Sequence, residues 1–172
     1  NPFTTLRNRK EEGLKLIVID PRRTELATQA DIHLQIRPGE DPTLLAAFIN
    51  IILSEDLHDH EFCEEWIEAT HLERLADATK DFTADFAANR CGVRKEDILA
   101  AAKLFAKGPT GTAGTGTGPS MSPYPSLMEH LVICLNVICG RWLRAGQIAE
   151  SRSLLQPNTP KRAQVLGPFN PL

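Results

Sequence analysis

Two aspartates stand where each of two short apolar stretches gives way to a loop. Asp20 follows the run LKLIVI (14–19), and Asp41 ends the loop RPGED (37–41) after the stretch DIHLQI (31–36). In open α/β sheets, ligands bind at the carboxyl ends of the strands. A carboxylate there can accept hydrogen bonds from both hydroxyls of a ribose, or from the ring N–H and amino N–H of guanine. The pair therefore predicts a guanosine site, with one aspartate for the sugar and one for the base.

The neighbours of these aspartates suit the same ligand. Arg22 and Arg23 offer forked donors for phosphate or for a purine edge, and Gly39 permits a tight turn. For either aspartate alone, the capping of a turn or a helix start explains the residue equally well. Both together, each beside an arginine and a proline, favour a nucleotide.

A glycine-rich stretch supplies a second, weaker signal. GTGTG (114–118) follows the candidate strand PTGTAG (109–114), and glycine exposes backbone N–H groups that can hold phosphates. The stretch is neither a GxGxxG turn with the correct flanking helix nor a Walker loop, because no GK[ST] follows. Taken alone, it is more simply a flexible loop.

The elements that would position these residues alternate between strands and helices. Short apolar runs predict buried, mostly parallel strands at residues 14–19, 31–36 and 109–114. Apolar residues at helical spacing predict helices at residues 2–12, 43–55, 59–67, 72–78, 83–89, 93–107 and 124–139. This order predicts an α/β fold with three layers, a mostly parallel Rossmann-like sheet and flanking helices. About three strands make a thin sheet for this length, so we expect strands to be missing at a cut edge.

The end of the chain has a different character. From Arg141 onward the periodicity fades and prolines accumulate, which is typical of extended surface chain. We therefore expect one α/β domain over residues 1–147 and an irregular C-terminal tail or linker over residues 148–172. The sequence opens NPFTT without a methionine, which we interpret as a start inside a longer protein.

Composition excludes several classes of function. The chain has 172 residues, of which 42% are hydrophobic and 24% charged, as in a globular domain. A net charge of −3 gives no electrostatic case for nucleic acid, and the apolar stretches fall far short of the ~18 residues of a membrane span. The cysteines form no CxxC pair, so we expect reduced, mostly buried thiols and a reducing compartment such as the cytoplasm; they are Cys63, Cys91, Cys134 and Cys139.

The histidines offer little by comparison. His58 and His60 in LHDHEF could suggest a metal site, but on a helix two such side chains point about 200° apart. A solvated helix start is the simpler expectation, and we predict no metal ligands in this chain. His33 alternates outward on its strand and needs no function.

Taken in order, these segments resemble a known family. KLIVIDPRRTELATQADIHLQIRPGEDPTLLAAFINIIL resembles a signature region of the molybdopterin oxidoreductases, the dimethyl sulfoxide reductase superfamily that includes formate dehydrogenases and nitrate reductases. EDILAAAKLFAKGPTGTAGTGTG and LMEHLVICLNVICGRWLRAGQ resemble the helix, strand, glycine loop and next helix of the same domain. The resemblance covers about residues 1 to 147 in unbroken order.

The resemblance implies a cofactor and its contacts. The family binds a bis(molybdopterin guanine dinucleotide) cofactor carrying molybdenum or tungsten. It implies that Asp20 contacts the guanosine portion and that Gly39 and Asp41 contact the guanine, while Glu40 replaces the commoner Thr or Ser. It also places the glycine loop against the cofactor and leaves a supporting role to three residues of the first loop; these groups are Gly114, Thr115 and Gly116, and Arg22, Arg23 and Thr24.

The resemblance also implies that this is an excised middle domain, inactive alone, that clamps guanosine within a two-electron oxidoreductase. Its partners would be the remaining domains of the parent enzyme, and the intact enzyme would meet a small-molecule substrate or an electron-transfer partner. An iron–sulfur cluster is expected in many intact members, but the cysteine cluster that binds it is not in this sequence. Two other classes remain open: a different nucleotide-binding α/β domain, as in thiamine-diphosphate enzymes or dehydrogenases, and an assembly domain without a ligand.

Overall fold

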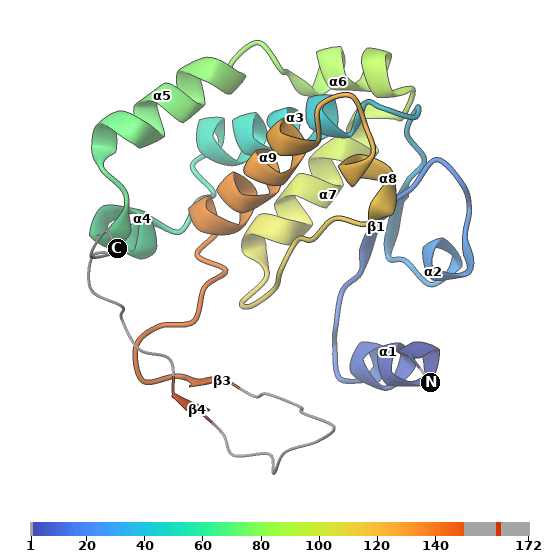
Figure 1. Ribbon diagram of the computed structural model, residues 1–172, viewed down its shortest axis with the longest axis horizontal. Coiled ribbons are helices and arrows are strands. Elements are labelled where there is room, and N and C mark those ends of the chain that lie inside the picture. The colour runs from blue at the N-terminus through green and yellow to red at the C-terminus, as the bar shows by residue number, and fades with distance from the viewer. Residues whose placement is uncertain (1, 150–160, 163–172) are drawn as a thin grey trace. The chain divides into compact units, whose positions relative to one another are not determined.

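The computed structural model describes residues 2–149 and 161–162, which fall into two units that divide between Gly140 and Arg141 (Figure 1). The first unit is mostly helical, and two parallel strands lie in it, β1 (Ile17–Ile19) and β2 (Ile32–Leu34). Its helices are α1 (Pro2–Glu11), α2 (Glu25–Thr28), α3 (Asp41–Ser54), α4 (His60–Trp66), α5 (Ala69–Thr79), α6 (Ala84–Cys91), α7 (Lys95–Lys107), α8 (Thr117–Ser120) and α9 (Pro125–Ile138).

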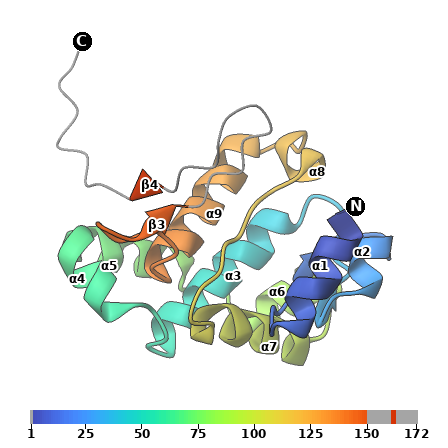
Figure 2. The ribbon, with the colours of Figure 1, turned by 90° about the horizontal axis from the view of Figure 1, so that it is seen from below.

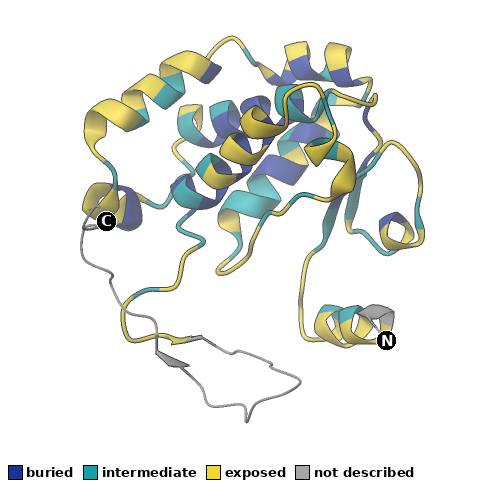
Figure 3. Ribbon diagram, in the orientation of Figure 1, coloured by how far each residue is buried: buried dark blue, intermediate teal, exposed yellow. Residues whose placement is uncertain are grey.

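Helix α3 is the centre of the first unit. Its sequence is apolar on nearly every face, and Pro42 fits the first turn, where no intrahelical partner for its nitrogen is needed. It packs against α5, α6, α7 and α9. Figure 2 shows α3 between α9 and α7, and Figure 3 shows the buried residues gathered along it. Leu44, Ile49 and Ile52 are fully buried, so this helix sets the position of whatever lies at its two ends.

The two strands form the parallel pair that the sequence predicted, and the connection between them contains a short helix that it did not predict. Ile17 pairs with Ile32 and Ile19 with Leu34 in parallel register, and α2 lies in the connection. Because the strands are parallel, their carboxyl ends lie at the same edge. The mixed α/β class expected from the sequence is thus confirmed, with a small sheet and a larger helical part.

The predicted third strand at residues 109–114 is wrong, because the described structure assigns this segment no strand partner. Instead, the side chain of Asn136 on α9 takes the place of a neighbouring strand. Ala113 N donates to Asn136 Oδ1 at 2.8 Å, and Asn136 Nδ2 donates to Ala113 O at 2.9 Å. A carboxamide has the same donor and acceptor groups as a peptide unit. The segment therefore obtains strand-like pairing from a helix.

The predicted helices are present, with boundaries shifted by a few residues, and the two four-residue helices α2 and α8 were not predicted. All four cysteines are free and three of them are buried, as expected; the exception is Cys134. Within the described residues, no helix is both long and apolar enough to cross a bilayer.

The second unit begins at Arg141. Its described part pairs β3 (Ile148–Ala149) with β4 (Lys161–Arg162) in an antiparallel ladder. Most of the tail predicted for residues 148–172 lies outside the described residues, so the division at 147 stays a prediction.

Candidate nucleotide-binding site

The carboxylates of Asp20 and Asp41 lie near each other at the carboxyl ends of the two strands. Asp20 directly follows β1, and Asp41 is the first residue of α3, which the loop after β2 leads into. Burial raises the pKa of Asp41, the charge of Asp20 raises it further, and a hydrogen bond from its own backbone N–H acts in the opposite sense. A like charge nearby acts in this way, because it disfavours a second negative charge. Both aspartates thus follow the carboxyl ends of the paired strands, as expected, while a guanosine site shared between them stays a prediction.

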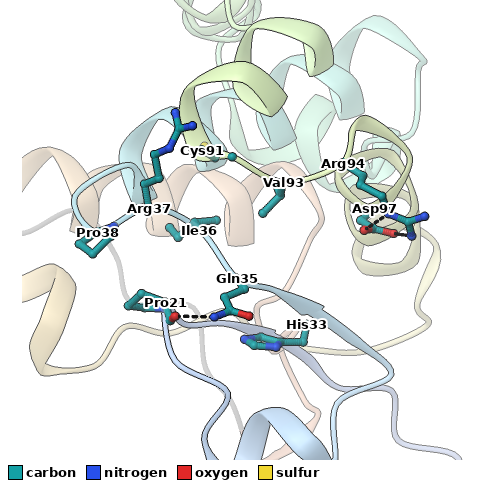
Figure 4. Close-up of a pocket in the computed structure, with 11 residues that line it drawn as sticks. Pro21, His33, Gln35, Ile36, Arg37, Pro38, Cys91, Val93, Arg94 and Asp97 are labelled. Carbon is teal, nitrogen blue, oxygen red and sulfur yellow. Dashed lines mark hydrogen bonds and ion pairs between the residues drawn. The ribbon is translucent and has the colours of Figure 1, made fainter.

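The turn after β1 is held by side chains of β2 and the residues that follow it. His33 Nε2 lies 2.9 Å from the carbonyl oxygen of Asp20, and Gln35 Nε2 donates to the carbonyl oxygen of Pro21 at 2.9 Å (Figure 4). The backbone N–H of Arg22 donates to Asp20 Oδ1 at 2.7 Å. One carboxylate oxygen of Asp20 is thus engaged in the turn. His33, for which the sequence predicted no function, is a positioning residue.

The loop 37–41 is fixed to the end of α6. Arg37 Nη1 donates to the carbonyl oxygens of Asn89 and Arg90 at 2.9 and 3.0 Å, which satisfies helix-end acceptors. The backbone N–H of Arg37 donates to Cys91 O at 2.8 Å. Gly39 has φ +89°, a conformation that favours glycine, as predicted for a tight turn. These contacts fix the direction in which the chain enters α3.

Glu40, which occupies the position of the expected Thr or Ser, has a structural role. Its carboxylate accepts from Arg90 Nη2 at 2.7 Å and Arg90 Nε at 3.3 Å, and from Thr43 Oγ1 at 2.7 Å. These bonds join the start of α3 to the end of α6. Glu40 is thereby engaged within the protein, whereas the surroundings of Asp41 disfavour its charged form.

An open hollow of about 660 Å³ adjoins the strand ends (Figure 4). Pro21, Gln35 and Pro38 line one side, and the start of α7 with the loop before it lines the other, where Arg94 binds Asp97 through two hydrogen bonds of 2.6 and 2.8 Å. The volume is in the range of small-molecule sites. The lining takes residues from both predicted loops, although neither Asp20 nor Asp41 is part of it.

The remaining predicted residues divide into two groups. In the loop after β1, Arg22 and Arg23 are exposed, while the Thr24 hydroxyl accepts from Ala27 N at 3.2 Å and caps α2.

In the glycine loop, Thr115 Oγ1 donates to the carboxylate of Glu129 on α9, and Ser120 Oγ donates to Gly116 O at 3.1 Å. These bonds attach the loop to α8 and α9. Glu129 was not predicted, since nothing in its local sequence distinguishes it from a surface residue. A binding role for any of the nine residues stays a prediction.

Comparison with known proteins shows that the chain is similar to part of several larger proteins. No protein-family model matches it. It is 45% identical over 96 residues to the F420-dependent formate dehydrogenase subunit alpha of Methanocaldococcus jannaschii, a match that covers 56% of this chain and 14% of the relative. It is 29% identical over 145 residues to the thiosulfate reductase molybdopterin-containing subunit PhsA of Salmonella typhimurium, covering 84% of this chain and 19% of the relative.

A solved structure agrees with these relatives. Acetylene hydratase from Pelobacter acetylenicus superposes with a TM-score of 0.77 at 32% identity, over 82% of this chain and 19% of that protein. The chain thus spans less than a fifth of the length of each of these three proteins.

Proposed function

Because this chain belongs to the molybdopterin oxidoreductases of the dimethyl sulfoxide reductase family, matched over part of their length, we propose that it holds the guanosine end of a molybdopterin guanine dinucleotide. The whole protein would then be a two-electron oxidoreductase that carries a bis(molybdopterin guanine dinucleotide) with molybdenum or tungsten. The other domains of that enzyme would be the partners of this one.

The observation that carries the proposal is the half-buried carboxylate of Asp41 beside that of Asp20. Burial and then the Asp20 charge raise the pKa of Asp41, so the folded chain by itself disfavours the charge that it holds there. A guanine offers a ring N–H and an amino group to one carboxylate, and a ribose offers two hydroxyls to the other. Such a ligand supplies donors to two acceptors that otherwise repel each other.

The glycine loop supports the same proposal. Gly114 and Gly116 have no positive φ, and a Cβ built on either would meet nothing within 4 Å. Neither backbone conformation nor crowding inside the described chain therefore requires glycine at these positions. A ligand that approaches the backbone closely would require it, and exposed N–H groups suit phosphate oxygens.

The chain would contribute binding and orientation rather than redox chemistry. When bound, the cofactor supplies the two-electron step at its metal. Asp41 would accept from the guanine, Asp20 from the ribose through the oxygen that the turn leaves available, and Arg22 and Arg23 would face phosphate. His33 and Gln35 would keep the first of these loops in place. Contacts remote from a reacting centre act by fixing its geometry.

The test is Asp41→Asn in the intact enzyme, with Asp77→Asn as the matched control on an exposed helix position. The amide keeps the shape but loses a charged acceptor that contributes about 1.5–3 kcal/mol, so we expect cofactor affinity to fall roughly 10- to 150-fold. The measurement is guanine nucleotide released per protein, together with metal content. Full retention in Asp41→Asn would refute the guanine role.

A second measurement addresses the alternative nucleotide-binding classes. Guanosine diphosphate should raise the thermal midpoint of the cofactor-free protein, and adenosine diphosphate should not. Equal protection by both nucleotides would contradict a site that recognises guanine.

A further inference from the structure

Three side chains of types that can bind metals lie close together just beyond the C-terminal end of α3. The ligand atoms of Asp56, His58 and His60 all lie within 4.8 Å of one another. Asp56 Oδ1 is 3.2 Å from His60 Nε2 and 3.7 Å from His58 Nδ1, and the two imidazole rings have centroids 4.1 Å apart. This cluster is separate from the strand ends and from every residue used in the proposed function.

The local backbone explains why these residues meet. Leu57 N donates to Ile52 O at 2.8 Å and Asp56 N donates to Leu53 O at 3.2 Å, the pattern of a Schellman motif that ends α3. Asp56 occupies its left-handed position with φ +57°, where glycine or asparagine is usual.

The next helix begins later than the sequence suggested. Asp59 caps α4 by accepting from Phe62 N at 2.9 Å, so α4 starts at His60 and His58 precedes it. The prediction that the two rings point about 200° apart is therefore wrong, because it assumed one continuous helix.

The imidazole of His58 is mostly buried, and one of its nitrogens has no hydrogen-bond partner. Its side chain is 12% exposed, and its buried Nδ1 makes no hydrogen bond. The 3.7 Å to Asp56 Oδ1 is too long for one. Buried polar atoms without partners are few and call for an explanation.

We propose that Asp56, His58 and His60 bind a divalent transition metal, with Zn²⁺ as the best match. Zinc takes imidazole nitrogen and carboxylate oxygen at about 2.0–2.2 Å in a tetrahedron, which puts neighbouring ligand atoms about 3.3 Å apart. The observed 3.2 and 3.7 Å lie on either side of that value. Three protein ligands leave one position for water or an outside ligand.

The exposure of the cluster says what kind of site this is. Asp56 and His60 are 73% and 54% exposed, so the metal would be reached from solvent. It would join the end of α3 to the start of α4 by a cation shared between Asp56 and His60. The site is thus suited to reversible binding that stabilises this junction.

The test is a calorimetric titration of the intact protein with Zn²⁺ after removal of exchangeable metal by EDTA. The wild type should bind one equivalent that both His60→Ala and Asp56→Asn lose or bind at least tenfold more weakly. Asn is tolerated at a left-handed position and His60 is exposed, so neither change should disturb folding. His71→Ala, at an exposed histidine outside the cluster, is the matched control and should bind as the wild type does.

Thermal unfolding provides an independent measurement. Zn²⁺ should raise the midpoint of the wild type and of His71→Ala, and should leave His60→Ala unchanged. The proposal is wrong if the wild type takes up no zinc, or if both cluster variants take up zinc with wild-type affinity. In the second case the zinc binds elsewhere on the protein.

Discussion

The two ends of α3 each carry an aspartate, and the two carboxylates lie in opposite electrostatic settings. Asp41 begins the helix, where the dipole favours negative charge, but it is half-buried beside Asp20. Asp56 lies just beyond the other end, about 20 Å away, where the dipole disfavours negative charge, but it is exposed and beside two histidines. At the N-terminal end, burial and the Asp20 charge outweigh the backbone hydrogen bond of Asp41, and at the C-terminal end a carboxylate faces two imidazoles. One residue type thus predicts two different ligands.

The largest effect is expected from a substitution that destabilises α3, the helix between the two aspartates. Ile49 lies in the middle of α3 and is fully buried, so Ile49→Ala leaves a cavity and should lower the free energy of unfolding by about 2–5 kcal/mol. Ile133→Ala, at a side chain that is 52% exposed on α9, should change it by less than about 0.5 kcal/mol. Urea denaturation measures both. Equal effects would mean that α3 is not the common support.

A smaller effect should distinguish the N-terminal end by its pH dependence. Burial, and then the charge of Asp20, raise the pKa of Asp41 above its ordinary 3.8. At pH values between 3.8 and the raised pKa, the folded state therefore binds more protons than the unfolded state. The free energy of unfolding should therefore fall as pH rises through that window. Asp41→Asn should flatten this part of the profile and stabilise the cofactor-free protein at pH 7. Denaturation curves from pH 3.5 to 7 would show it.

Asp31 serves as a control of opposite sign for that profile. Burial tends to raise its pKa, but hydrogen bonds from Lys10 and from the backbone N–H of Leu16 outweigh this and lower the pKa to about 2. Its contribution should be present above about pH 4 and be lost as the pH falls toward 2. If Asp31→Asn made the free energy of unfolding fall more steeply with pH above pH 4, this assignment would be wrong.

The C-terminal end should respond to the backbone conformation at Asp56. Asp56 has φ +57°, and an L-residue in that region costs roughly 1 kcal/mol relative to glycine. In EDTA, Asp56→Gly should therefore stabilise the protein by about 1 kcal/mol, while Asp56→Ala should not. The same glycine variant should lose zinc binding. A stabilised Asp56→Gly variant that still bound zinc would show that Asp56 is a turn residue and not a zinc ligand.

The smallest effect is expected at the ion pair that joins α3 to α6. Arg90 is 57% exposed and Glu40 is 18% exposed where the two side chains bind each other, and ion pairs at the surface contribute about 0.2–1 kcal/mol. Arg90→Ala should lower the free energy of unfolding by no more than that, and high salt should reduce the difference. A loss of several kcal/mol would show that Glu40 supports the entry to α3 more strongly than its exposure suggests.

The sequence predicted those parts of the fold that depend on short-range pattern. The helix α3 and the two strands were predicted from their apolar residues. Their aspartates were singled out because parallel strands must end at one edge. The strand predicted at residues 109–114 was wrong, because a strand needs another strand as its partner, and the partner of Ala113 is a side chain 23 residues away. Helical spacing also misled at His58, since a left-handed Asp56 ends α3 and shifts the start of α4 to His60.

The sequence suggested which residues could act as acceptors in the candidate site, a role that stays a prediction, but it did not reveal the side chains that hold these loops in place. Asp20, Gly39 and Asp41 were identified by residue type and place. The roles of His33 and Gln35 as holders of the first loop depend on which carbonyl oxygens lie opposite them, which alternation along a strand does not reveal. The bond between Thr115 and Glu129 depends in the same way on how α9 packs.

The side-chain amide of Asn136 couples the position of α9 to that of the glycine loop. Gly114 follows Ala113 directly, so any rotation of α9 about its own axis carries the start of that loop with it. Leu127 and Ile133 on the same helix remain open to solvent. A neighbouring domain that pressed on those two side chains would shift the backbone of the glycine loop without touching it.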